Sequence, residues 1–241
     1  PAEGRSVAVE PARPSLLFIA PACMPPVNAE AIVNAKLVLA MLDAGWHVDV
    51  IAMSNLRRLY ADTHFEAWEQ ISSTTHESSL PTEWGPATLL ARMRGYMKVG
   101  YLTTDLDWAH RALRSAMKMV TRTPYDAVVS RASPIVAHVV ASVLAKRFGM
   151  AWIANWNDPA PQVRYPPPYG KGPTAAIPRH FDKTLRRSAL KATWHTFPCE
   201  RLRQYSAHFP VQLPVPSSRR GCHGAAQFCQ EAESSGGAGY R

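Results

Sequence analysis

Residues 127–159 constrain the fold more than any other stretch, because they combine two candidate strands with one candidate helix. Residues 127–130 carry a β-branched pair, and residues 151–154 are apolar enough for a strand that is buried on both faces. Between them, apolar side chains recur at helical spacing over residues 134–148. The order strand, helix, strand predicts one unit of an α/β sheet.

Local residue types support both ends of this predicted helix. Ser133 can accept a hydrogen bond from a free amide of the first turn, and Pro134 suits the first helical position. Gly149 readily adopts the left-handed conformation that ends a helix. His138 lies on the helix, where we predict a partly buried packing residue rather than a catalyst.

A second unit of the same kind occupies residues 15–52. Residues 15–20 are apolar throughout and predict a buried strand, and residues 46–52 predict its neighbour. Asn28 can cap the helix between them, whose dipole favours Glu30 in the first turn, and Gly45 closes it. The predicted buried stripe of this helix comprises Ile32, Ala35, Val38, Leu39 and Leu42.

The loop that precedes this helix bears on cofactor binding. A strand followed by a helix N-terminus presents free amides to a phosphate group. Residues 21–28 nevertheless lack the glycines of such a cradle and match neither the dinucleotide fingerprint nor a Walker loop. ATP- and NAD-dependent chemistry is therefore disfavoured, and we expect no cofactor.

The remaining segments are predicted in less detail. Residues 55–84 are polar and predict one strand with loops, whereas residues 87–120 predict one or two helices, with breaks at Gly95 or Gly100. Basic and apolar side chains mix in this helical stretch, which is typical of a helix on an anionic membrane surface. More often such a helix packs on its own sheet with the basic residues outward. The last predicted elements are a basic helix, a strand and a helix, at residues 179–191, 194–197 and 200–208.

These elements define the expected domain organisation. Residues 1–14 form a loose lead-in, and residues 15–209 form one α/β domain with a Rossmann-like, open, mostly parallel sheet flanked by helices. Residues 210–241 show no periodicity and are rich in Ser and Gly, so we expect a disordered or non-native tail.

Composition narrows the classes of partner and compartment. The net charge of +9 favours an anionic partner, which could be a nucleotide phosphate, an acidic membrane face or nucleic acid. The alternative explanation of this charge is that it keeps the protein soluble. The sequence shows no secretion signal and no apolar run of about 20 residues. Its four cysteines are too few and scattered for a disulfide framework, which favours the cytoplasm. The spacings of His195 with Cys199 and of Cys222, His223 and Cys229 match no paired zinc signature, so no metal is expected.

Polar residues that follow predicted strands are the candidate site. Asn155, Asn157 and Asp158 follow the strand at 151–154, at the carboxyl end, where open α/β sheets bind ligands. Asp158 suits a base or a partner for sugar hydroxyls, although Asn-Asp-Pro is also ordinary turn chemistry. Arg131, beside Ser133, can hold a phosphate or carboxylate in a fork, or can be a surface residue beside a helix cap.

Several stretches, taken in order, resemble the N-terminal half of a family 4-like glycosyltransferase of the GT-B fold. Residues 16–21 with 28–30 are similar to the family's first strand and helix start, and residues 45–51 to its Gly-His-x-Val-x-Val strand. Residues 125–134 and 152–159 resemble the strands and loops that face the interdomain cleft, and the family's last strand–helix junction resembles residues 196–202.

This resemblance implies a retaining, metal-independent transfer of a sugar from a UDP- or GDP-sugar to a glycan or lipid-linked acceptor. By carry-over, Asn28 and Ala29 approach the donor diphosphate, although the family's glycine pair is absent there. Arg131, Ser133 and Asp158 line the acceptor side. In the family a second domain binds the nucleotide, so this chain is expected to be the acceptor half, truncated before that domain and inactive alone, in the cytoplasm or at the inner membrane face.

Two other classes of function stay open. The first is a non-catalytic binding or regulatory module that keeps a Rossmann-like fold. The second is a basic nucleic-acid binder, which predicts steeply salt-dependent binding. The aromatic and basic residues follow no nucleic-acid module pattern, so nucleic acid is not expected as a partner.

Overall fold

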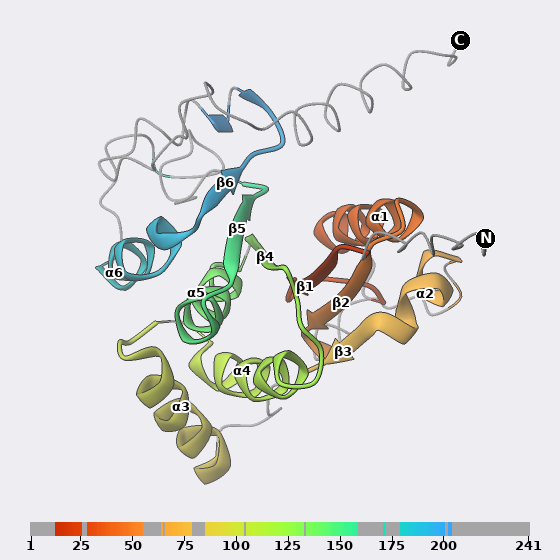
Figure 1. Cartoon of the computed structure of the whole chain (residues 1–241). Coiled ribbons are helices and arrows are strands. Elements are labelled where there is room, and N and C mark those ends of the chain that lie inside the picture. Colours follow the sequence, from red (N-terminus) through yellow and green to blue (C-terminus); the bar gives the residue numbers. More distant parts are fainter. Residues whose placement is uncertain are drawn as a thin grey trace, which may run out of the picture.

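The computed structural model describes one α/β unit built on a six-stranded, all-parallel sheet (Figure 1). The described residues are 13–25, 28–54, 64, 66–78, 85–103, 105–132, 134–158, 171, 179–200 and 202–203. The strands are β1 Ser15–Ile19, β2 His47–Ala52, β3 Thr75–Glu77, β4 Ala127–Ala132, β5 Ala151–Trp156 and β6 Trp194–Thr196. The predicted Rossmann-like fold class is confirmed.

The strand order is β3-β2-β1-β4-β5-β6, the order of the Rossmann fold. The sequence runs outward from β1 to one edge and then returns to β4, which pairs with β1 over Leu16↔Ala127 to Ile19↔Ser130. The chain therefore reverses its direction of winding between β1 and β4. The carboxyl ends of these two strands form the topological switch point, where open sheets of this kind bind ligands.

Helices cover both faces of the sheet. The helices are α1 Ala29–Asp43, α2 Glu66–Ile71, α3 Pro86–Val99, α4 Leu106–Val120, α5 Val136–Phe148 and α6 Arg179–Arg187, with short 3₁₀ turns at Ser72–Thr74 and Ala189–Lys191. Figure 1 shows α1 and α2 on one side of the sheet and α4 and α5 on the other. Alternate side chains of β1 supply the two cores, since Leu17 packs with the α4 and α5 layer and Phe18 with the α1 layer.

Several predicted helix ends are confirmed. The Asn28 side chain accepts a hydrogen bond from the Ala31 amide at 2.8 Å and so caps α1. Gly149 ends α5 with a φ of 66°, and Gly45 follows α1 with a φ of 80°. The predicted boundaries at residues 14 and 209 stay predictions, because residues 1–12 and those from 204 onward lie outside the described residues.

Three local predictions are wrong. Helix α5 begins at Val136 and not at Pro134, and Ser133 lies outside the described residues. Residues 55–84 contain α2 in addition to the predicted strand, since its six residues are too few to show a clear period. The buried face of α1 is rotated from the predicted stripe and comprises Ala31, Asn34, Ala35, Val38 and Met41.

Gly95 does not break the helix as the sequence suggested. Helix α3 runs through it to Val99, and Gly100 ends the helix with a φ of 80°. A Cβ atom at Gly95 would lie 2.1 Å from the Leu106 carbonyl oxygen, far inside van der Waals contact. Glycine is therefore required here because α3 passes so close to the start of α4.

Replacing Gly95 by alanine tests this close approach. Alanine favours a helix interior by about 1 kcal/mol over glycine, but its methyl group would push against the Leu106 backbone. We expect Gly95→Ala to lower the free energy of unfolding by about 2 kcal/mol or more. Urea denaturation measures the change. The control is Gly85→Ala, where an added Cβ meets nothing within 4 Å, and we expect a change below about 1 kcal/mol. Equal losses in the two variants would contradict the explanation.

Candidate functional site

A buried arginine organises the polar residues at the carboxyl edge of the sheet. Arg131 lies near the end of β4 and is only 4% exposed. Its Nε donates to Asn34 Oδ1 and its Nη1 donates to Asn155 Oδ1, both at 2.5 Å, and its Nη2 donates to Asn157 Oδ1. Each of the three guanidinium nitrogens thus has an amide oxygen as its partner.

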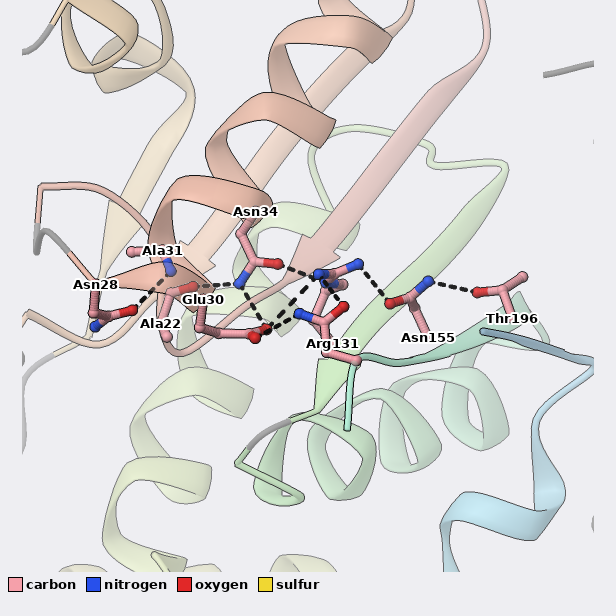
Figure 2. Close-up of polar contacts among 9 residues, drawn as sticks. Ala22, Asn28, Glu30, Ala31, Asn34, Arg131, Asn155 and Thr196 are labelled. Atoms are coloured by element: carbon pink, nitrogen blue, oxygen red, sulfur yellow. Dashed lines mark hydrogen bonds and ion pairs between the residues drawn. The ribbon is translucent and has the colours of Figure 1, made fainter. Parts of the chain in front are cut away.

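The arrangement follows from the parallel register of the strands. Arg131 pairs with Asn155 across β4 and β5, so the two side chains leave the sheet on the same face. That face carries α1, from which Asn34 approaches, as Figure 2 shows. Asn155 in turn donates to Thr196 Oγ1 of β6 at 2.7 Å. One row of side chains therefore joins α1, β4, β5 and β6.

Glu30 brings negative charge to the same row. Its Oε1 accepts from Asn34 Nδ2 at 3.3 Å and lies 3.8 Å from Arg131 Nη2, while its Oε2 accepts from Asn157 Nδ2. Asn34 Nδ2 also donates to the Ala22 carbonyl oxygen in the loop after β1. These contacts fix the start of α1 against the ends of β4 and β5. Below, "the Arg131 cluster" denotes Glu30, Asn34, Arg131, Asn155, Asn157 and Thr196.

Electrostatics within the cluster balance burial against nearby carboxylates. Burial lowers the pKa of Arg131, and the negative charges of Glu30 and Asp158 act in the opposite direction. An arginine keeps its proton at neutral pH, so the cluster contains a charged guanidinium with little water around it. The Cys23 thiol stays neutral, since burial raises its pKa to about 12. The Glu30 carboxylate, whose side chain is 21% exposed, and three amide oxygens surround this fixed cation.

The predicted site residues fall into three groups. Arg131 and Asn157 lie in the cluster, and Asp158 follows Asn157 close enough for its charge to act on Arg131. Asn28 and Ala29 lie at the start of α1, with the Asn28 side chain engaged as the helix cap. Ser133 lies outside the described residues. That these residues bind substrate stays a prediction.

Sequence reasoning omitted Glu30, Asn34 and Thr196 from the site. Asn34 carried a usable signal, because it is a polar residue within the helical face that α1 buries. Asn155 was recognised as a polar group at the strand's carboxyl end but was given no binding role, although it precedes Asn157 by two positions and a strand turns such residues to one side. Glu30 and Thr196 come from remote segments, and only the folded sheet brings them to Arg131.

A second buried polar group lies on the opposite face of β4. Ser130 Oγ accepts from Trp152 Nε1 at 2.7 Å and lies 2.8 Å from His138 Nδ1. Either the Ser130 hydroxyl or His138 Nδ1 can donate in this contact, depending on the tautomer of the ring. His195 Nδ1 accepts from Trp156 Nε1 at 3.0 Å. Burial lowers the pKa of both histidines, so both imidazoles are neutral at neutral pH. The predicted packing role of His138 agrees with its complete burial, which is greater than the partial burial expected.

Comparisons with known proteins do not identify a family. No protein-family model matches the sequence, and no curated protein shows significant similarity to it. Among the helices that the structure describes, none is both long and apolar enough to cross a bilayer. Within the described ranges, no three His, Cys, Asp or Glu side chains gather as a metal site, and Cys222, His223 and Cys229 lie outside those ranges.

Arg131→Lys tests whether the guanidinium fork holds the cluster together. A lysine ammonium is compact and cannot reach three separated amide oxygens. We expect a loss of about 2–4 kcal/mol in the free energy of unfolding, because buried amides lose their donors. Thermal and urea denaturation check this value. Arg122→Lys, at an exposed position, is the control and should stay within about 0.5 kcal/mol of the parent. A loss no larger than the control's would show that Arg131 is not the organiser.

The buried histidines predict a pH dependence of stability. Burial lowers the pKa of His138 to about 3 and that of His195 to about 4, from an ordinary value of 6.5. Below pH 6.5 these histidines bind protons in the unfolded chain but not in the folded chain. Their contribution to the free energy of unfolding is therefore fully present above pH 6.5 and decreases as the pH falls. Each histidine contributes a slope of about 1.4 kcal/mol per pH unit. Urea denaturation between pH 4.5 and 6 should show a slope smaller by about this amount in His138→Asn. An unchanged slope would contradict the assignment.

Proposed function

We propose that residues 15–209 form the acceptor-binding domain of a glycosyltransferase with a GT-B architecture. The observation that carries the proposal is the position of the Arg131 cluster at the carboxyl edge of the parallel sheet, beside the β1–β4 switch point. Amide and carboxylate side chains surround a fixed guanidinium there. Sugars present many hydroxyl groups, each of which donates and accepts, and such side chains match them.

The proposed reaction is transfer of a sugar from a UDP- or GDP-sugar to a hydroxyl of a glycan or lipid-linked acceptor, with retention and without a metal. The bond between the anomeric carbon and the diphosphate oxygen breaks, a bond from the anomeric carbon to the acceptor oxygen forms, and the acceptor hydroxyl passes its proton to the departing diphosphate. Asn157 and Asp158 would orient acceptor hydroxyls. The free amides at Asn28 and Ala29 would face the diphosphate, whose growing negative charge a helix N-terminus stabilises.

Two features of the chain fit a domain that handles only part of this reaction. The first-turn carboxylate of Glu30 is held in the Arg131 cluster, where it reduces the attraction of α1 for a diphosphate. Donor affinity in this chain should then be weak but still measurable by titration, with a second domain supplying most of the nucleotide binding. The net charge of +9 fits a protein in the cytoplasm at an anionic membrane face, where lipid-linked acceptors are found.

One observation favours a different class, a non-catalytic binding module. All three nitrogens of Arg131 already have partners within the chain. A guanidinium in this state acts as a structural tie and offers no free fork to a ligand. A regulatory domain that recognises a small molecule or a partner by its shape would need only the fold.

Calorimetric titration with UDP-glucose and GDP-mannose separates these two functions. We expect binding of at least one donor, and loss of that binding by tenfold or more in Ala29→Asp. The added carboxylate suits the helix N-terminus but would occupy the position of the diphosphate. The control is Val33→Asp, which adds the same charge at an exposed position of α1 and should leave binding unchanged. A folded chain that binds neither donor would favour the non-catalytic module.

A further inference from the structure

Helix α3 presents its large apolar side chains to solvent. The residues that face α4 are small, with Thr88, Ala91 and Gly95 buried. The opposite side carries a stripe of exposed apolar residues, here called the α3 stripe, in which Met97 is 71% exposed and Leu89 60%. Its members are Leu89, Leu90, Met93, Tyr96 and Met97. Leu102, just beyond the helix, is 64% exposed as well.

This arrangement corrects, for α3, the favoured expectation that the helices at residues 87–120 pack on their own sheet with only basic residues outward. Helix α4 behaves as expected and buries its apolar face, including Trp108 and Leu113. Helix α3 does the reverse. Exposing this many contiguous apolar side chains is unfavourable in water, and large patches of this kind mark a surface that binds something.

Cations border the α3 stripe. A period of 3.6 residues places Arg94 and Lys98 along one border and Arg92 along the other. An apolar stripe between cationic borders is the pattern of a helix that lies in the interface of an anionic membrane. The apolar side chains enter the acyl region, and the cations stay among the phosphates.

A cationic hollow continues from the end of α3. It has a volume of about 900 Å³ and lies between the last residues of α3, the end of α5 and the turn after α6. Five cations line it, and no acidic residue is among the described residues of its wall. They are Lys98, Lys146, Arg147, Arg187 and Lys191. Hydroxyl groups of Tyr101, Ser142 and Ser188 form a hydrogen-bonded chain in its wall.

Among the residues that the structure describes, none of the five cations forms an ion pair with an acidic side chain. Burial lowers the pKa of Lys98, and the charges of Arg114, Arg147 and Arg94 lower it further. Arg187 lies over the Tyr101 ring, 5.9 Å from its centroid. The volume lies within the range of small-molecule sites, about 300–1,000 Å³. The hollow therefore suits an anionic group of moderate size, such as a phosphodiester with its attached alcohol.

We propose that the α3 stripe and the adjoining hollow together form a docking site for an anionic phospholipid, with the stripe in the bilayer and the headgroup phosphate in the hollow. Lys98 links the two parts, because it borders the stripe and also lines the hollow. The proposal rests on the membrane location in the proposed function but not on sugar transfer. Two residues of the hollow's wall lie at the amino ends of strands: Gly149 shortly before β5, and Thr193 directly before β6. The hollow therefore lies at the amino edge of the sheet, opposite the Arg131 cluster.

A second copy of the chain fits this surface less well. Two α3 stripes packed face to face would bring their cationic borders together, and like charges in contact repel. The hollow would also stay unoccupied in such a dimer, with its five cations near those of the partner. An anionic lipid surface supplies apolar chains and phosphates in one structure, which matches both parts of the site.

Vesicle flotation at low salt tests the proposal with the full chain. We expect binding to phosphatidylcholine vesicles that contain 30% phosphatidylglycerol and none to pure phosphatidylcholine. Met97→Ser should weaken binding about tenfold, whereas Val33→Ser, at another exposed apolar position, should not. Lys146→Gln with Lys191→Gln should weaken binding about tenfold or more, since each lysine near an anionic surface contributes to attraction. The control with equal loss of charge is Arg13→Gln with Lys36→Gln, both exposed.

Four results would overturn the proposal. One is absence of binding to phosphatidylglycerol vesicles, and another is equal binding to neutral vesicles. The third is a dimer that Met97→Ser converts to a monomer, together with no vesicle binding, which would assign the stripe to a second copy. Excess inorganic phosphate that displaces the protein from vesicles would show a site for free phosphate and not for a lipid. The donor titrations proposed above are independent of these results, so failure of one proposal leaves the other testable.

Discussion

The buried guanidinium of Arg131 is the interaction on which the carboxyl edge of this sheet depends. Removing a charge from water is expensive, and the structure offsets that expense with three amide oxygens and one carboxylate. The partners come from α1, β5 and the turn after it. Fixing the charge therefore fixes where the first helix starts relative to the middle strands.

The two faces of β4 carry two different polar networks. Arg131 leaves the strand toward α1, and Ser130, one residue earlier, leaves it toward α5 and bonds His138. Alternation along a strand thus places one polar network on each side of the sheet's centre. The network under α5 consists of neutral imidazoles and indole donors, and the one under α1 carries charge. The edge is consequently rigid on one side and electrostatically active on the other.

Much of this fold was predictable from the sequence, and the limits are physical. The strands and the caps at Asn28 and Gly149 depend on neighbouring residues, so local pattern sufficed. The outward apolar stripe of α3 was not predictable, because amphipathicity defines two faces but does not say which of them is buried. Gly95 was misread for a related reason: its close contact is with Leu106, in the following helix. The site was predicted in part, since strand ends were recognisable but the partners Glu30 and Thr196 come from elsewhere.

The parallel sheet also sets a distance. Its amino edge carries the cationic hollow and its carboxyl edge carries the Arg131 cluster, and the strands between them have up to six residues. Strands of that length span about 20 Å. A protein seated on phosphates by one edge would hold the other edge at about that height above the bilayer surface. Under the two proposals together, an acceptor would have to present its reactive hydroxyl above the headgroups in order to reach the Arg131 cluster.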